Sequence, residues 1–474
     1  MAPSAAVLLP PEVVHEILQW VDNTQALLSC RLVSPIFRDT AAVFAFRSVV
    51  VKKSKSLADP GAKLTFEELV KRLNLYRHVR KISFDFRGVQ LRTSLSSSGE
   101  GETVEHIENA AMEEVLKEVA LLASFPKVTY LSIHFPLDEE LLPLRDDETG
   151  QHYAPHLPGH IHFQDCLLRR LASLQVEHRL VINSLDLFGV IPERHNALKS
   201  AGLQSLFSQL SAVSIRVYPG LLAKPYFHSW ESLWESFAAF SQDLSLPLDS
   251  SKNLETITYS GDKDAECVNA RWSSWKDLHF PKPKHLRFQV TSFLCHESTT
   301  IPSDFLSRHG ATLERIEMDH CFMTNETVGT WVGLFSRMQA ELDNLVEFTF
   351  HPPLGMDRDD DPQCPDHYHR YGWFDSSQQD GMGFSTASWD GMLFDYEEEI
   401  EEEMETLQAL HATTKERRGR LCHQGANNKI SGFEGRGKEN SEISEEEGAE
   451  EVEDDECDKY NIIVHVNLGP NCLI

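Results

Sequence analysis

Residues 383–387, Gly-Phe-Ser-Thr-Ala, approximate the nucleophile elbow of serine hydrolases, in which a serine attacks an acyl carbon. Such an elbow needs a strand before the serine and a helix after it, because a sharp turn must hold the hydroxyl exposed. Here both flanks consist largely of Gly, Gln, Asp and Ser, and this composition favours a loop. We therefore interpret Ser385 as a loop residue, and a hydrolase is kept only as a rival hypothesis.

Three alternating aspartates, Asp357, Asp359 and Asp361, match the first positions of a calcium-binding loop. The sixth position of that loop requires glycine for its sharp turn, and the twelfth requires a bidentate glutamate. This chain has Pro362 and Tyr368 at those two positions. The segment therefore lacks both the turn residue and the ligand that a calcium site needs.

Cys364, His367 and His369 are side chains of the types that bind zinc and other transition metals. Their Cys-x-x-His-x-His spacing has no second cluster beside it, whereas a structural zinc site needs four ligands. The sequence also lacks a glycine-rich phosphate loop followed by Lys and Ser or Thr. We expect no metal, no cofactor and no catalytic residue, and a metalloenzyme is kept as a second rival hypothesis.

The elements that precede these segments are more informative, and the first of them are helical. Pro11 suits the first turn of a helix, where its missing N–H would have no partner in any case. Apolar residues then recur at helical spacing and make one apolar face: Val13, Val14, Ile17, Leu18 and Val21. Asp22 or Asn23 is a suitable cap for a second short helix, and Ser34 followed by Pro35 starts a third. Three such helices cannot easily bury a core alone, so we expect an exposed apolar face and a partner.

This segment resembles an F-box through its Leu-Pro-x-Glu opening at 9–12 and its Leu-Val-Ser-x-x-Phe motif at 32–37. An F-box is a small helical module that docks on an adaptor of a cullin-based ubiquitin ligase, so the resemblance implies a binding protein rather than an enzyme. The family places a set of residues at or near the adaptor-binding surface: Leu9, Pro10, Glu12, Ile17, Leu28, Val33 and Phe37. Many relatives carry Trp at the position of Phe37, and this chain departs from the family there.

The composition limits the class of protein. A chain of 474 residues exceeds one ordinary domain, and 41% hydrophobic content is enough for a large core. The net charge of −29 argues against nucleic-acid binding, which needs a basic surface for the phosphates. Nine scattered cysteines without a Cys-x-x-Cys pair favour a reducing compartment, and no run approaches the roughly 18 apolar residues of a membrane span. We expect a soluble protein of the cytoplasm or nucleus, without a membrane or nucleic-acid partner.

A short pattern of three apolar residues recurs between residues 79 and 350. Two residues separate the first apolar residue from the second, and one residue separates the second from the third. The central residues of its eight copies are Ile82, Leu131, Leu185, Val213, Ile257, Leu286, Ile316 and Phe348. Helix-like stretches lie between the copies, at 105–124, 165–177, 230–240 and 326–340. Short apolar strands that alternate with helices predict a mainly parallel sheet with the helices on its outer side.

This alternation resembles the irregular leucine-rich-repeat-like arrays of many fungal F-box proteins, and Cys321 stands where such repeats often carry Asn or Cys. The resemblance implies a curved sheet in which each unit buries its apolar face against its neighbours. The intervals between central residues vary from 28 to 54 residues, so an ordinary mixed α/β domain is the alternative. The expected fold class is α/β, with an N-terminal all-α F-box of three short helices followed by an irregular solenoid.

The last part of the chain has a different composition. Residues 351–474 contain 30 acidic and 10 basic residues, a net charge of −20. A charged helix is predicted from Tyr396 to about Arg420, followed by a segment with the acidic composition of disordered chains. We divide the chain as follows: 8–50 F-box, 51–78 linker and first helix, 79–353 repeat-like array, 354–423 insert with a loop and the charged helix, 424–458 acidic disordered segment, and 459–474 last strand.

These features together predict a substrate-recognition subunit of an SCF-type ubiquitin ligase. Its F-box would bind the Skp-family adaptor and thereby the cullin, while the array would bind an unidentified protein substrate. A scaffold or interaction protein that acts outside a ligase is the alternative within the binding class. A helix-turn-helix DNA reader is a weaker hypothesis, because residues 35–47 offer only Arg38 and Arg47 to hold phosphates.

Overall fold

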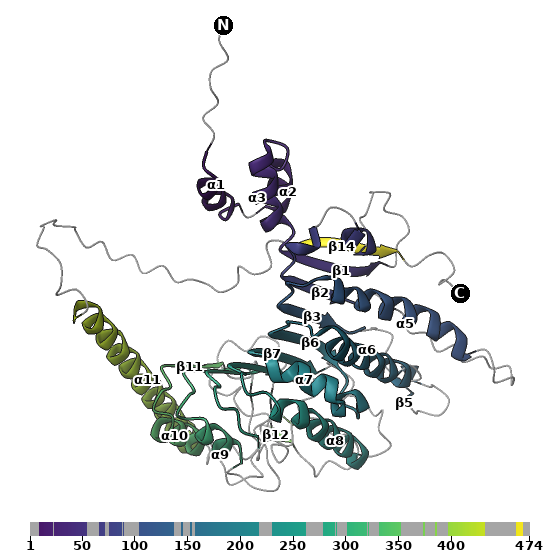
Figure 1. Cartoon of the computed structure of the whole chain (residues 1–474). Helices are drawn as coiled ribbons and strands as arrows, with labels where there is room; N and C mark the ends of the chain where they lie inside the picture. Colours follow the sequence, from purple (N-terminus) through teal and green to yellow (C-terminus); the bar gives the residue numbers. More distant parts are fainter. Residues whose placement is uncertain are drawn as a thin grey trace, which may run out of the picture.

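The computed structural model shows three N-terminal helices followed by one large parallel sheet with helices packed on it (Figure 1). The expected α/β fold class is therefore confirmed. The structure describes the following residues: 9–21, 23–54, 66–71, 75–87, 89, 104–136, 144–145, 152–153, 157–217, 230–261, 278–289, 291, 301–319, 321, 331–351, 373–374, 384–385, 397–431 and 461–467.

The N-terminal helices begin at the signals that the sequence supplies. They are α1 (Pro11–Leu18), α2 (Thr24–Cys30) and α3 (Pro35–Ala45). Asn23 is the cap of α2, since its side-chain oxygen accepts a hydrogen bond from the Ala26 amide at 3.1 Å. The Ser34 hydroxyl accepts one from the Phe37 amide at 3.3 Å and caps α3. Short helices of this kind are stabilised by such caps and by packing rather than by length.

The sheet has ten strands, and every pair of neighbours runs parallel. From one edge to the other the strands are β11 (Glu347–His351), β10 (Arg315–Asp319), β9 (His285–Gln289), β8 (Thr256–Ser260), β7 (Ala212–Val217), β6 (Ser184–Val190), β3 (Tyr130–His134), β2 (Lys81–Asp85), β1 (Ser48–Ser54) and β14 (Asn461–Asn467). Apart from β14, the order in space follows the order in the sequence, as in a chain that adds one strand and one connection at a time.

The central residues of the repeated apolar pattern lie opposite one another in the register. Leu185 pairs with Val213, Val213 with Ile257, Ile257 with Leu286, Leu286 with Ile316, and Ile316 with Phe348. Each of them is at most 5% exposed, because the helices cover this side of the sheet. All eight predicted strands are therefore present and adjacent in one parallel sheet, as expected.

The turn into each strand repeats the same hydrogen-bond geometry. A carbonyl just before one strand accepts hydrogen bonds from two consecutive backbone amides at the start of the next strand, at 2.7 to 3.1 Å. The accepting carbonyls belong to Arg47, Arg80, Thr129, Asn183, Ser211, Glu255, Lys284 and Glu314. The repetition is independent of the length of the connection, so the long intervals in the sequence do not interrupt the array. Cys321 also bridges two strands, since its thiol donates to the Phe288 carbonyl at 3.4 Å.

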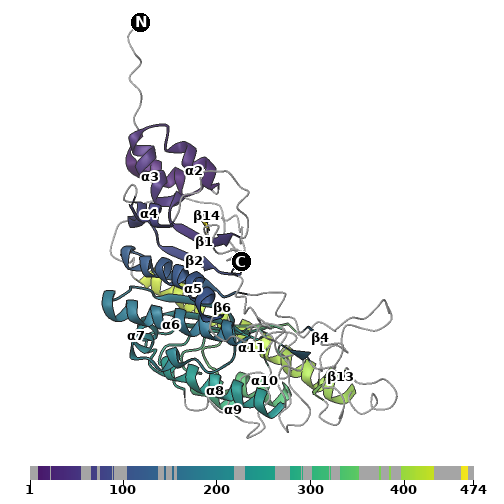
Figure 2. The same ribbon diagram turned by 90° about the vertical axis from the view of Figure 1, so that its right-hand side faces the viewer.

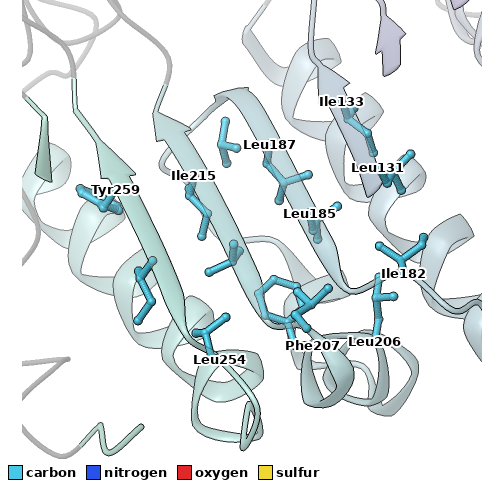
Figure 3. Close-up of a cluster of buried hydrophobic side chains, with 14 of the residues drawn as sticks. Leu131, Ile133, Ile182, Leu185, Leu187, Leu206, Phe207, Ile215, Leu254 and Tyr259 are labelled. Atoms are coloured by element: carbon cyan, nitrogen blue, oxygen red, sulfur yellow. The ribbon is translucent and has the colours of Figure 1, made fainter. Parts of the chain in front are cut away.

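The helices form one layer, and most of them pack on the next one along the chain. They are α5 (Val104–Ala120), α6 (Leu157–His178), α7 (Ala201–Gln209), α8 (Trp230–Asp249), α9 (Ile301–Arg308), α10 (Trp331–Glu341) and α11 (Glu397–Ser431), with short turns at α4 (Phe66–Lys71), η1 (Leu75–Arg77), η2 (Leu121–Ser124) and η4 (Asn196–Lys199). Figure 2 shows this layer running along the array from α5 to α10. Aliphatic side chains from strands and helices fill the interface, as around Leu185 and Phe207 in Figure 3.

The main correction to the predicted organisation is strand β1. Residues 48–54 were divided between the F-box and a linker, but they form the first strand of the sheet. The sequence does carry the signal, since Phe46, Val49 and Val51 repeat the apolar spacing and are at most 6% exposed. The helical segment therefore passes directly into the array without a linker.

The C-terminal part differs from expectation in one boundary. Helix α11 ends at Ser431 rather than near Arg420, so the first residues of the segment predicted to be disordered are helical. Residues 432–458 lie outside the described residues. The expected last strand is present as β14, which pairs in parallel with β1 from Ser48↔Asn461 to Ser54↔Asn467. Two small antiparallel pairs, β4 (Leu144–Arg145) with β5 (His152–Tyr153) and β12 (Trp373–Phe374) with β13 (Phe384–Ser385), were not predicted.

Candidate functional site

Helix α1 is apolar on two sides. Val14 and Leu18 are 1% exposed and belong to the main hydrophobic core. Val13 and Ile17, which were predicted to share their face, are instead 41% and 46% exposed. Together with Leu9 they follow a four-residue spacing, so they form a stripe along the outer side of the helix. A helix with one buried and one exposed apolar stripe has a surface left for a partner.

Further exposed apolar side chains lie beyond α1. Trp20, one turn after Ile17, is 78% exposed, and Leu32 and Val33 in the turn after α2 are 88% and 68% exposed. Most of the large hydrophobic side chains that are exposed among the described residues lie between positions 9 and 43. We call this set the adaptor stripe, made of Leu9, Val13, Ile17, Trp20, Leu32, Val33 and Val43.

The residues that the sequence nominated for adaptor binding divide into two groups. Leu9, Pro10, Glu12, Ile17 and Val33 are exposed. The other two, Leu28 and Phe37, are half-buried and pack against the core. Their role in binding stays a prediction. Because they pack against the core, they are placed to support the exposed residues from below the surface.

Four members of the stripe were missed from the sequence: Val13, Trp20, Leu32 and Val43. For Val13 and Trp20 the signal was available, because their spacing from Ile17 is helical. Leu32 and Val43 gave no such signal, because only the packing of α2 and α3 decides which of their apolar residues remain outside.

A second surface lies on the sheet. Strand residues alternate between two faces, and those beside the buried central residues point away from the helix layer. We call this side the polar face. It is made by the residues one before, one after and three after the central residue of each of the strands β1, β2, β3 and β6 to β11, with Val49 as the central residue of β1. On β10 these are Arg315, Glu317 and Asp319, whereas Ile316 and Met318 between them are 0% exposed.

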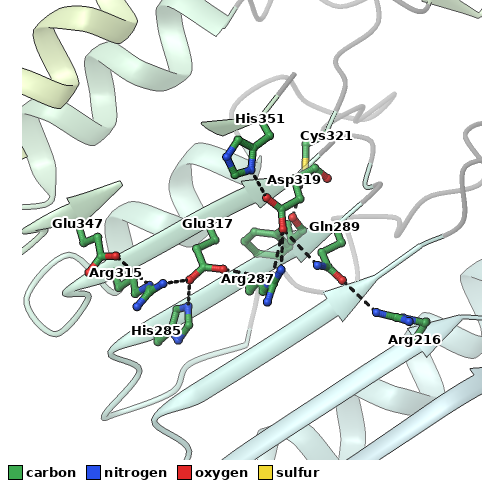
Figure 4. A network of polar contacts seen from close by, with 11 residues as sticks. Arg216, His285, Arg287, Gln289, Arg315, Glu317, Asp319, Cys321, Glu347 and His351 are labelled. Atoms are coloured by element: carbon green, nitrogen blue, oxygen red, sulfur yellow. Dashed lines mark hydrogen bonds and ion pairs between the residues drawn. The ribbon is translucent and has the colours of Figure 1, made fainter. Parts of the chain in front are cut away.

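The polar face of β9, β10 and β11 carries a connected network of charged side chains (Figure 4). Glu317 forms ion pairs with Arg287 at 3.1 Å and with Arg315 at 2.5 Å, and it lies 3.1 Å from His285 Nε2. The hydrogen bond with His285 holds the pKa of Glu317 below its ordinary value, against the effect of burial. Glu317 is therefore ionised at neutral pH, and its charge is balanced by Arg287 on β9 and by Arg315 on its own strand.

Asp319 continues the network two residues further along β10, on the same face of the sheet. Its carboxylate accepts from Arg287 at 2.9 Å and Gln289 at 3.1 Å, and it lies 2.6 Å from His351 Nδ1. Burial opposes its ionisation, but the bonds from His351, Gln289 and Arg287 outweigh burial and lower the pKa of Asp319. This end of the polar face is thus internally paired.

The polar face of β3, β6 and β7 is built differently. The rings of His134 and Phe188 are stacked, with centroids 4.3 Å apart and planes 8° from parallel. The Arg216 guanidinium lies over the Phe188 ring at 5.2 Å from its centroid. Burial lowers the pKa of His134 to about 4, so this ring is neutral at neutral pH and the stack carries only the charge of Arg216.

These three residues, His134, Phe188 and Arg216, were not nominated from the sequence. They occupy equivalent places on three neighbouring strands, three positions after Leu131, Leu185 and Val213. The apolar pattern could have found them once the strands were assumed to lie side by side in register. It could not show that a histidine, a phenylalanine and an arginine would stack.

The segments considered for catalysis contribute no assembled site to the described structure. Ser385 lies in β13 and pairs with Trp373, while Cys364, His367 and His369 lie outside the described residues. Within the described residues, no group of three or more His, Cys, Asp or Glu side chains is placed to hold a metal ion. No helix in the described part of the chain is long and apolar enough to cross a membrane.

Comparison with known proteins bears on the first of these surfaces. The family model described as the F-box domain matches residues 7–47, which include α1, α2 and α3 and the adaptor stripe. A comparison with curated proteins gives no match. F-box domains typically bind Skp-family adaptors, so the match supports a role in F-box-mediated protein interaction. This chain is therefore an F-box domain-containing protein.

Proposed function

We propose that this protein is the substrate-recognition subunit of a cullin–RING ubiquitin ligase of the cytoplasm or nucleus. The observation that carries the proposal is the adaptor stripe on a segment that matches the F-box domain. A stripe that includes Trp20 at 78% exposure is costly to leave in water and suits a hydrophobic interface. In this role the chain itself catalyses nothing, and ubiquitin transfer takes place on other subunits.

The connection between the F-box and the sheet supports the proposal. Helix α3 ends at Ala45, Phe46 is 6% exposed, and the Arg31 guanidinium lies over the Phe46 ring at 5.1 Å. The Arg47 carbonyl then accepts the first amides of β2. One hydrophobic core runs through both parts, so the F-box and the sheet hold a fixed relative orientation. Fixed orientation is what a subunit needs to raise the effective concentration of a target beside a ligase.

The polar face of the sheet is the proposed target-binding surface. Its polar side chains extend across neighbouring parallel strands, while the opposite face is covered by the helices. Repeat-like arrays use such extended strand-lined surfaces for binding. The target is an unidentified protein, and the leucine-rich-repeat resemblance remains part of this proposal.

The adaptor half of the proposal is tested by co-purification. The full-length chain is co-expressed with a Skp-family adaptor and a cullin, as wild type, as Leu9→Ala with Pro10→Ala, and as Ile17→Lys. Both variants should lower adaptor recovery at least about tenfold, because a truncated or charged stripe loses roughly 1.4 kcal/mol or more of binding free energy. Val176→Lys is the matched control, since Val176 is a hydrophobic residue 68% exposed on α6, outside the stripe.

Equal recovery of adaptor with the wild type and both stripe variants would show that the F-box does not bind through this surface. Adaptor recovered without any cullin would favour the alternative, a scaffold that acts outside a ligase. Thermal unfolding of each variant shows whether the sheet remains folded, so that loss of binding is not confused with loss of structure.

A further inference from the structure

The cations of the polar face fall into two groups. Lys52 lies 3.8 Å from Asp85, and Arg287 and Arg315 are held by carboxylates of the β10 network. Within the described residues, Lys81 and Arg216 have no carboxylate at ion-pair distance. Both lie over aromatic rings instead, Lys81 at 5.1 Å from the Tyr130 centroid and Arg216 at 5.2 Å from that of Phe188.

Arg216 is the better placed of these two to contact a ligand. Arg216 is an exposed residue, its guanidinium is oriented by the stack on Phe188, and one N–H donates to Gln289 Oε1 at 3.4 Å. The residue beside it on β8 is Ser260, whose side chain is short. The remaining N–H groups of a planar, preoriented guanidinium match the two oxygens of a carboxylate.

The charge around Arg216 indicates which anion fits. Arg287 is paired with Glu317 and Asp319, although its positive charge is still felt at Arg216. Asp186, which accepts a hydrogen bond from Tyr130, lies close enough to Lys81 and Arg216 to feel both charges. Asp186 repels any anion beside Arg216, but it repels a dianionic phosphate about twice as strongly as a singly charged carboxylate. A phosphate also needs several cations, whereas a carboxylate needs only one guanidinium.

We propose that Arg216 is the specificity-determining contact of the polar face and receives an Asp or Glu side chain from an acidic segment of the target protein. The inference rests on the proposed function, because it names the class of target for the same surface. The stack of His134, Phe188 and Arg216 presents the guanidinium, and Lys81 adds a second positive charge toward the F-box end of the face.

The probe is a random library of 12-residue peptides displayed on phage, selected on the full-length chain bound to a Skp-family adaptor. The wild type should select peptides with Asp or Glu at one fixed position. A synthetic peptide of the selected sequence is then compared with versions that carry Gln or phosphoserine at that position, using fluorescence anisotropy. The acidic peptide should bind about tenfold more tightly than the Gln peptide, because one charge-assisted pair is lost.

The variant Arg216→Gln should remove this tenfold difference, since the two peptides then bind alike. Arg418→Gln is the matched control, because Arg418 is an exposed arginine on α11 that is remote from the polar face, and it should keep the difference. Ser214→Trp places a bulky residue beside Arg216 on β7 and should block all the selected peptides.

Each other outcome overturns a defined part of the argument. Tightest binding by the phosphoserine peptide overturns the choice of a carboxylate. Peptides that Ser214→Trp blocks but that show no acidic position, or no sensitivity to Arg216→Gln, overturn the inference and leave the target-binding face intact. Peptides that Ser214→Trp does not affect, or a selection without enrichment, overturn the target-binding face and the inference with it, while adaptor co-purification still reports on the F-box.

Discussion

The two faces of the sheet are built from alternate residues of the same strands, yet they have opposite chemistry. On β10, Ile316 and Met318 are completely buried under the helices, while Glu317 and Asp319 point to the other side and bind cations of the neighbouring strands. The apolar face gains stability from burial, about 1.5–3 kcal/mol for each large side chain. The polar face can therefore vary in sequence without loss of the fold, and this freedom suits a recognition surface.

The sharpest test of this difference is a charge placed on each face. Ile316→Asp puts an unpaired carboxylate into a site that is 0% exposed, and it should lower the free energy of unfolding by about 4 kcal/mol or more. Thr258→Asp puts the same group on the polar face beside Arg287, and its effect should stay within about 0.5 kcal/mol. Urea denaturation of both variants measures the contrast, and similar losses would show that the two faces do not differ in this way.

A buried histidine in the helix layer should make that layer sensitive to acid. Burial lowers the pKa of His309 to about 4, from an ordinary value of 6.5. Its Nδ1 lies 2.8 Å from the Phe305 carbonyl, and its Nε2 accepts the Phe280 amide at 3.0 Å, so the neutral ring satisfies both neighbours. Below pH 6.5 the unfolded chain takes up a proton that the folded chain refuses until about pH 4.

Stability should therefore fall as the pH drops from 6.5 to 4, and His309 alone should account for roughly 3 kcal/mol of that fall. In the variant His309→Gln this contribution is absent, so its stability should change less over the same interval. The free energy of unfolding, measured in urea at several pH values for both proteins, tests the point. Parallel pH curves would mean that His309 is not the buried neutral group described here.

The charge network of the polar face should contribute a smaller amount, with a different pH dependence. Glu317→Gln keeps the shape of the side chain but leaves Arg287 and Arg315 without one carboxylate, and it should cost about 1–2 kcal/mol at pH 7. Because the pKa of Glu317 is held below 4.5, this stabilisation is present above pH 4.5 and is lost as the pH falls through the lowered value. The two proteins should thus converge in stability in acid; a gap that persists at pH 2 would contradict this account.

The sequence predicted the apolar face better than the polar one, for a physical reason. A short buried strand must repeat apolar residues at fixed spacing, and even the copy with Pro283 at its first position forms a strand. That proline lies before β9, and the amides that bond to the preceding strand belong to Lys284 and His285. Strand β1 was missed only because its apolar residues directly follow the last F-box helix.

The polar face depends on which strands become neighbours. Glu317 receives partners from residues 285, 287 and 315, and the Arg216 stack joins side chains from three strands. No local pattern requires these side chains to meet, since each of them alone would be an ordinary polar strand residue. The adaptor stripe was predicted less well than the apolar face but better than the polar face. Its helical spacing is visible in the sequence, whereas the packing of α1 against α3 decides which side of α1 is buried.

The smallest expected effect concerns the edge of the sheet beside the F-box. Strand β14 covers the edge of β1, while α11, which precedes it in the sequence, packs on α10 and β11 at the opposite edge. The ten-stranded sheet separates these edges by about 43 Å, at about 4.8 Å for each spacing between strands. The residues between Ser431 and Asn461 therefore connect elements that lie at opposite edges of the sheet, whatever their sequence is.

Replacement of residues 432–458 by a Gly/Ser sequence of equal length should therefore leave the protection of β1 amides from hydrogen exchange unchanged. Deletion of the same residues leaves two residues in the connection, which reach about 10 Å at most, so β14 must leave β1. The loss of one edge strand should lower the free energy of unfolding by less than about 1 kcal/mol but speed exchange within Ser48–Ser54. Equal exchange in the two variants would show that β14 does not protect this edge, and the boundary of the sheet would then be β1 itself.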